Sequence, residues 1–296
     1  MEPTKLTLRM NRAIRALAIP ALVSWQSAVA GDAVDKNQFH LFNPTPTEHL
    51  RALNTDRPDK TESPYTVDAG HFQLEMDLAT FDRDHDTASG ADSVTERWAV
   101  APINLKAGLS NHVDLQLIVE TYNYVRTNDG AARSRTKQSG FGDITARLKV
   151  NLWGNDGGKT AFGVMPFVKV PTNRADLGNN AVEGGLILPL ALDLGHGFSM
   201  GLMTEFDFIQ NSTGGDYHAE FVNSVTVSHD IFGKLGGYAE FWSLASAEGN
   251  SDWQGTFDAG LTCGVTDRIQ LDGGVSIGVT KSAPDVQPFV GLSIRF

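Results

Sequence analysis

The sequence predicts an all-β fold: a twelve-stranded antiparallel β-barrel that spans a membrane. Three observations support this class. From residue 71 to the C-terminal residue, large apolar side chains occupy every second position of successive runs. The connections between these runs are alternately short and long, which is typical of outer-membrane barrels. The chain also begins with a segment that has the features of a secretory signal.

Residues 1–30 read as a signal peptide. Four basic residues precede an apolar run over 16–25, which is too short to cross a bilayer, and Ala28-Val29-Ala30 supplies a cleavage site. Cleavage after Ala30 leaves 20 Lys and Arg against 34 Asp and Glu, a net charge of −14. An acidic exported chain is not expected to bind nucleic acid.

Residues 31–70 form a separate N-terminal segment. Its prolines, at positions 44, 46, 58 and 64, break any long helix or strand. Between Asp56 and Glu62 the segment is dense in charges of both signs. Two interpretations stay open: a solvated periplasmic linker, or a polar plug folded into the barrel lumen.

Residues 71–296 are the predicted barrel, and Leu186–Phe208 is its clearest part. Leucines alternate with other residues up to Gly195-His196-Gly197, and phenylalanine, methionine and leucine alternate with smaller or acidic residues after it, as in a β-hairpin. The expected short connections are 110–112, 154–159, 195–197, 230–234 and 266–268. The expected long connections are 82–93, 126–138, 171–180, 210–216, 246–252 and 282–286.

The charges fix which face of the strands looks outward. Arg147 and Lys149 alternate with Leu148, and exposing either basic residue to lipid would cost ~2–4 kcal/mol near the bilayer centre. We therefore expect the basic residues inside and the leucine in lipid. A soluble sandwich would need apolar cover for about twelve strands and charged outer faces, which the sequence lacks. The tryptophans expected in an interfacial girdle are Trp98, Trp153, Trp242 and Trp253.

Three prolines lie within predicted strands, where a proline removes a ladder hydrogen bond. They are Pro102, Pro166 and Pro189, and the alternation shifts phase at Pro102. The functional interpretation is a wall defect that opens sideways and lets an apolar solute leave into the membrane. The alternative is a set of bulges that only shape the barrel.

Particular motifs resemble a known family. The run Thr55–Val67, the run Gly70–Glu75, the Gly140-Phe141-Gly142-Asp143 motif and the terminal Phe296 are similar to outer-membrane proteins of the meta-pathway of phenol degradation. The resemblance covers residues 50–296. It implies a monomeric barrel surrounded by lipid in the outer membrane of a Gram-negative bacterium. It further implies passage of small solutes, hydrophobic or aromatic ones among them, and a role for Phe296 as the signal for the barrel assembly machinery.

Twelve strands should enclose a narrow lumen with room for a plug, since eight-stranded barrels are filled and those with 16–18 strands hold an aqueous pore. The candidate lumen residues are the charged ones of both parts: Asp56, Arg57, Asp59, Glu62, Arg147, Lys149, Lys169, Glu205 and Asp207. We expect the acids of the N-terminal segment near the inward basic residues, and Arg57 near Glu205 or Asp207. The alternative is that these charges only hydrate the lumen wall.

The leading function is a passive channel, without cofactor, metal or catalytic residues. One rival is an outer-membrane lipid hydrolase, which needs a nucleophile and a base in contact. The nearest arrangement, His196-Gly197-Phe198-Ser199, has the wrong spacing and lies in a predicted periplasmic turn. A second rival is a barrel with a structural or adhesive role.

Overall fold

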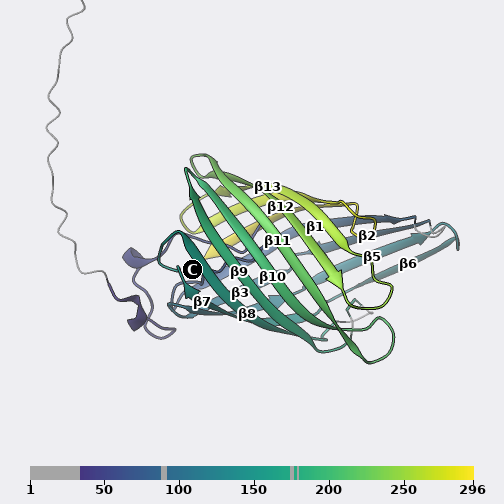
Figure 1. The fold of residues 1–296 in the computed structure, drawn as a ribbon, viewed down its shortest axis with the longest axis horizontal. Helices are drawn as coiled ribbons and strands as arrows, with labels where there is room; N and C mark the ends of the chain where they lie inside the picture. Colours follow the sequence, from purple (N-terminus) through teal and green to yellow (C-terminus); the bar gives the residue numbers. More distant parts are fainter. Residues whose placement is uncertain (1–33, 88–91, 174–176, 179) are drawn as a thin grey trace, which may run out of the picture. The chain divides into compact units, whose positions relative to one another are not determined.

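Fifteen β-strands and two short 3-10 helices make up the regular structure of the residues described by the computed structural model, which are 34–87, 92–173, 177–178 and 180–296. The expected signal peptide lies outside these residues. Residues 35–296 form one unit (Figure 1). No helix within the described residues has the length and apolar character to cross a membrane.

The elements follow one another along the chain with short helices first. The helices are η1 (Lys36–Gln38) and η2 (Thr47–His49). The strands are β1 (Phe72–Asp86), β2 (Ser93–Val100), β3 (Ile103–Ser110), β4 (Val113–Val119), β5 (Tyr122–Asp129), β6 (Ser134–Gly140), β7 (Ile144–Trp153), β8 (Thr160–Val170), β9 (Glu183–Gly195), β10 (Phe198–Gln210), β11 (Tyr217–Phe232), β12 (Leu235–Ser246), β13 (Gln254–Gly264), β14 (Ile269–Gly278) and β15 (Val286–Arg295).

All fifteen strands belong to one antiparallel sheet that closes on itself. Each strand from β7 to β15 pairs with the next one, and β15 pairs back to β1. β1 pairs with β2 along its second half and with β3 along its first half. The pairs β2/β3, β4/β5 and β6/β7 are each one wall strand with an interruption, so the wall has twelve strands, as expected from the sequence.

The two faces of the wall differ as the alternation predicts. On β10, Leu202 and Phe206 are exposed whereas Met203 and Asp207 are buried. On β7, Leu148 is 37% exposed and its neighbour Lys149 is almost completely buried. The apolar outer face continues around the described wall, which is the distribution that lipid requires.

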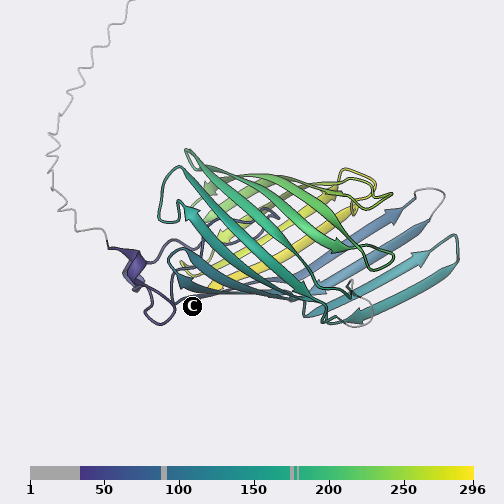
Figure 2. The same cartoon turned by 60° about the horizontal axis from the view of Figure 1, so that its bottom comes forward.

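Two predicted loops are partly strands, which corrects the expected boundaries. β1 continues to Asp86, and β5 and β6 form a hairpin through the region 126–138. Cross-strand polar pairs stabilise this extension: Arg126 pairs with Glu96, and the hydroxyls of Thr95 and Thr127 lie 3.2 Å apart. The second half of β1 projects with β2, β5 and β6 beyond the other strands at the end with the long loops (Figures 1 and 2). Polarity alone therefore did not mark the ends of these strands.

Candidate functional site

The chain between η2 and β1 lies along the inner face of the barrel. Its prolines prevent regular secondary structure, so its backbone N–H groups need other acceptors. The wall supplies carboxylates: the Val67 amide donates to Asp114 of β4 at 2.9 Å, and the Lys60 amide donates to Glu240 of β12 at 2.9 Å. The sequence of the segment and the inner face of the barrel are therefore complementary.

Asp56 joins the segment to two lysines of the barrel wall. Its carboxylate accepts from the Lys149 ammonium at 2.6 Å and also from the Lys106 ammonium. Lys106 also donates to Glu75 of β1 at 2.5 Å. Burial by itself would raise the pKa of Asp56, but the ammonium groups of Lys106 and Lys149 outweigh it and hold the pKa below its usual range. Asp56 is therefore a charged anchor inside the barrel.

Arg57 is anchored to the opposite part of the wall. Its guanidinium donates to Asp77 of β1 at 2.6 Å and to Asp272 of β14 at 2.7 Å. A Cβ atom at Gly291 would lie 2.0 Å from this guanidinium, so a larger residue there would have to displace the Arg57 side chain. The expected contact with Glu205 or Asp207 is wrong, because those acids lie on β10 and the two acids nearer to Arg57 satisfy it.

The next turn of the segment is held by Glu240. This buried carboxylate accepts from the Thr61 amide at 2.8 Å, in addition to the Lys60 amide. The Lys60 ammonium lies 3.3 Å from Asp258, and Glu62 pairs with Arg147. We call residues 56–62, which carry all of these contacts, the segment tip.

The remaining charged candidates behave differently from one another. Lys169 does not bind the segment but pairs with Glu183 of the adjacent strand at 2.5 Å. Glu205 and Asp207 lie on β10, where their side chains are partly and largely buried. Asp59 is in no ion pair of the described residues, and it lies beside Thr226 and Glu240. Burial, followed by the Glu240 carboxylate, raises the pKa of Asp59 to about 8.

One side of the lumen is filled by apolar side chains, which the sequence analysis did not expect. The buried cluster consists of Met165, Ile187, Met203 and Val222, with Phe167, Trp242 and Leu244 packed against it. These residues come from five consecutive strands, β8 to β12. Trp242 corrects the predicted girdle, since its ring packs on this cluster and lies 4.9 Å from the Lys60 ammonium. Trp98, Trp153 and Trp253 are each about half exposed.

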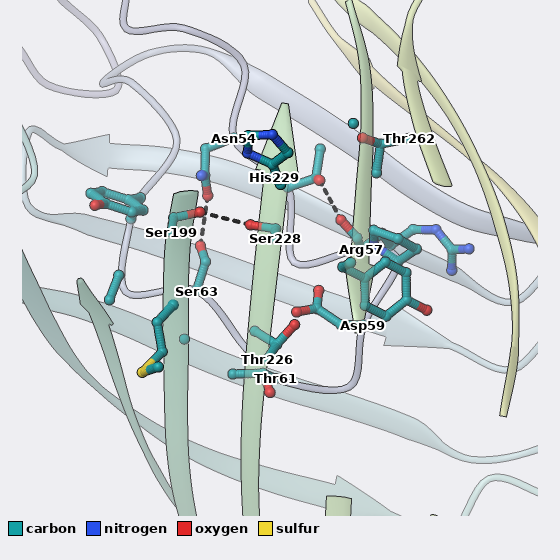
Figure 3. Close-up of a pocket in the computed structure, with 18 of the residues that line it drawn as sticks. Asn54, Arg57, Asp59, Thr61, Ser63, Ser199, Thr226, Ser228, His229 and Thr262 are labelled. Atoms are coloured by element: carbon teal, nitrogen blue, oxygen red, sulfur yellow. Dashed lines mark hydrogen bonds between the residues drawn. The ribbon is translucent and has the colours of Figure 1, made fainter. Parts of the chain in front are cut away.

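Two cavities meet at the segment tip. The larger, of about 540 Å³, lies between the segment and β9–β14, and Figure 3 shows Asp59 beside Thr226 within it. The smaller, of about 240 Å³, is lined by Asp77, Pro102 and Arg147. Four residues of the tip line both cavities: Arg57, Pro58, Asp59 and Glu62. The tip is thus the partition between two hollow parts of the lumen.

Three adjacent wall strands are interrupted at the same level. Ala101-Pro102 separates β2 from β3, Glu120-Thr121 separates β4 from β5, and residues 141–143 separate β6 from β7. The register places these interruptions side by side, since Ile103 pairs with Val119 and Val119 pairs with Ile144. A cavity of about 380 Å³ borders this row. Within the described strands, β6 is bonded to β5 alone.

The three prolines do not form one defect. Pro102 belongs to the row of interruptions, whereas Pro166 and Pro189 lie within β8 and β9. The described pairing of β8 with β7 lapses beside Pro166, and its pairing with β9 lapses beside Pro189. Pro166 and Pro189 thus lie on adjacent strands, whereas Pro102 is separated from them by the strands β4/β5 and β6/β7.

The geometry offers little to a hydrolase. The Ser199 hydroxyl lies 2.7 Å from the Ser228 hydroxyl, and among the described residues it forms no hydrogen bond with His196. No group of three His, Cys, Asp or Glu side chains within the described ranges is arranged to hold a metal ion. The arrangement can hold the segment in place and leave hollow space beside it.

Sequence reasoning missed most of the wall residues that anchor the segment, and we consider four of them: Glu75, Lys106, Glu240 and Asp272. All four lie on the inner face by the same alternation that identified Arg147 and Lys149. The sequence therefore contained a signal for these residues, because a charged residue at an inward position of a strand needs a partner in the lumen. What the sequence could not supply was which of these residues meet.

Solved structures similar to this chain include an outer-membrane channel with the same fold. The COG4313 outer membrane channel from Pseudomonas putida F1 has a TM-score of 0.57 at 11% identity, covering 82% of this chain and 100% of that chain. The translocator domain of the autotransporter NalP from Neisseria meningitidis has a TM-score of 0.47 at 10% identity, over 76% and 88% of the chains. The CymD monoaromatic hydrocarbon channel has a TM-score of 0.42 at 10% identity, over 76% and 87%.

The family of this protein is identified from its sequence. No curated protein matches the chain. A family model does match it over residues 55–296, a range that begins at the segment tip and includes the whole barrel. The fold is that of outer-membrane β-barrels, with lipid around its apolar outer face. On this evidence the chain belongs to the family described as "Putative MetA-pathway of phenol degradation".

Proposed function

We propose that this protein is an outer-membrane channel for the passive diffusion of small molecules, hydrophobic or aromatic ones among them. The observation that carries the proposal is the cavity of about 540 Å³ between the segment and β9–β14. A volume of that size accommodates a small organic molecule. The family description, which names phenol degradation, supports an aromatic solute.

The N-terminal segment acts as a plug in this proposal. Its tip divides the lumen, and its anchors on β1, β3, β7, β12 and β14 cross the barrel from one side to the other. Passage therefore requires either space beside the tip or movement of the tip. The buried ion pairs favour a tip that stays in place, since leaving a buried charge unpaired is costly.

Conductance of the purified protein in planar bilayers tests the proposal. We expect small conductance steps from the full-length mature chain and several-fold larger ones after deletion of residues 31–69, because the lumen then loses its partition. A deletion of residues 31–39 alone is the matched control and should behave as the full chain does. Absence of conductance from both the full chain and the larger deletion would contradict the channel. Equal conductance from the two would leave a channel without a plug.

We further propose that apolar solutes leave sideways through the row of interruptions at Pro102. Three broken strands at one level, the bordering cavity of about 380 Å³ and the single partner of β6 among the described strands support this route. Pro102→Val restores a backbone N–H donor and should slow the uptake of toluene without changing the uptake of glycerol. Pro166→Val and Pro189→Val are matched controls with normal toluene uptake. Unchanged toluene uptake in Pro102→Val would end the lateral proposal.

The two rival functions have less support. A lipid hydrolase would need Ser199 in contact with a base, and its hydroxyl is bonded to Ser228 instead. A purely structural or adhesive barrel leaves the cavities on both sides of the segment tip without a use. The conductance experiment separates both rivals from the channel.

A further inference from the structure

Asp59 differs from the other charged residues of the segment tip. Asp56, Arg57, Lys60 and Glu62 each form an ion pair with the barrel wall. Asp59 takes part in no ion pair of the described residues, although it lies on the same turn. A carboxylate inside a protein usually has a charged partner, so an unpaired one calls for an explanation.

The position of Asp59 supplies one. Asp59 lines the larger cavity and also the smaller one, so a solute that moves from one to the other must pass it. Figure 3 shows its carboxylate directed into the larger cavity beside Thr226. The other charged residues shared by both cavities, Arg57 and Glu62, are paired: Arg57 with Asp77 and Asp272, and Glu62 with Arg147. When Asp59 is ionised, the passage therefore carries a negative charge that no ion pair of the described residues compensates.

A second, independent observation comes from Tyr238 of β12. Its side chain is only 8% exposed, it lines the larger cavity, and its hydroxyl has no hydrogen-bond partner among the described residues. A buried hydroxyl without a partner is uncommon and indicates that something else completes it. Thr226 and Glu240 are the neighbours of Asp59 on β11 and β12, and Asp258 of β13 lies close by, so none of these described wall residues supplies a positive charge.

We propose that Asp59 and Tyr238 form a cation-selective step at the segment tip, through which the channel passes small cations, organic ammonium ions included, in preference to anions. The carboxylate attracts a cation, and the carboxylate and phenol oxygens accept hydrogen bonds from an ammonium group. An anion meets repulsion from Asp59 and from the acids behind it. The inference rests on the proposed channel and names a selectivity residue within it.

The test is the reversal potential of the full-length mature protein in planar bilayers under a KCl gradient. At about pH 9, where Asp59 is ionised, we expect a preference for K⁺ over Cl⁻, and Asp59→Asn should reduce the K⁺/Cl⁻ permeability ratio by about threefold or more, since one charge acts strongly in a narrow passage. The conductance level should persist, because Asp59 forms no ion pair with the described part of the wall. Asp267→Asn is the matched control: Asp267 lies in a turn, pairs with Lys234 and is almost fully exposed.

The same measurement at different pH values tests the role of Asp59 directly, because the charge of Asp59 depends on pH. With its pKa raised to about 8, the preference for K⁺ should increase as the pH rises from about 7 to about 9. Asp59→Asn should remove this increase. Tyr238→Phe removes the phenol oxygen that accepts from an ammonium group, so it should weaken the block by benzylammonium while it leaves the K⁺/Cl⁻ ratio almost unchanged.

The outcomes keep the two proposals apart. Absence of any conductance from the wild-type protein contradicts the channel itself. Clear conductance without a preference for cations, or a permeability ratio that Asp59→Asn and Asp267→Asn change equally, leaves the channel intact and overturns the selectivity step.

Discussion

At the scale of single residues, Asp56 decides where the segment sits. Its carboxylate lies between two ammonium groups whose side chains are nearly inaccessible, those of Lys106 and Lys149. Because water hardly reaches either ammonium group, solvation cannot compensate for the loss of the Asp56 carboxylate. The pKa of Asp56 lies below its ordinary value, so its stabilising contribution is present at neutral pH and is lost only as the pH falls through that lowered value. Mild acid, about pH 5, should therefore leave the segment in place.

We predict that Asp56→Asn destabilises the docked segment by about 3–5 kcal/mol, because it leaves a buried ammonium without its carboxylate. Trypsin cleavage after Lys60 and urea unfolding in detergent measure the change. Asp156→Asn is the control: Asp156 also binds the segment, through Lys36 and Arg51, but is 37% exposed, so its loss should cost less than about 1 kcal/mol. Equal trypsin sensitivity of the two variants would show that Asp56 is not the main anchor.

At the scale of elements, side-chain hydrogen bonds stabilise the row of interrupted strands. Thr121, which lies between β4 and β5, donates its hydroxyl toward two carbonyls of the neighbouring interruption, those of Val100 at 2.6 Å and Ala101 at 2.8 Å. Ala101 has a φ of +52°, a conformation that costs a residue with a Cβ some stability. The side chain of one broken strand thus replaces ladder hydrogen bonds of the next.

Thr121→Val should therefore lower the free energy of unfolding by about 1–3 kcal/mol, since it leaves these carbonyls without a donor. Thr121→Ser keeps the hydroxyl and should stay close to the wild type. Urea titration of the refolded barrel, followed by tryptophan fluorescence, measures both. If the valine and serine variants unfold at the same urea concentration, the hydroxyl does not hold the interruption.

At the scale of the whole molecule, two kinds of contact fill the lumen on opposite sides of the segment. Ion pairs fill the side of β1, β3 and β7, and the apolar cluster centred on Met165 and Ile187 fills the side of β8 to β12. A barrel of this size is too wide to be filled by wall side chains alone and too narrow for an open pore. The segment completes the packing and leaves hollow space beside it, including the two cavities that meet at its tip.

Much of the site could be predicted from the sequence, but its pairings could not. Inward positions follow from the alternation, so Arg147 and Lys149 were placed correctly on the inner face. Partners depend on where each strand stands around the barrel and on its register. Arg57 illustrates this: acids of β1, β10 and β14 all point inward, and only the strand order places Asp77 and Asp272 within its reach.

The sequence by itself determined the strand number, the lipid-facing side and the separate character of the N-terminal segment, because each is a local property of alternation, charge or proline content. The tertiary structure decided which charges meet, which side of the lumen is dry, and that three strands break at one level. These features join residues far apart in the chain, such as Arg57 and Asp272, and they exist only once the sheet has closed. The register of the strands and the closure of the sheet therefore determine which residues meet inside the lumen.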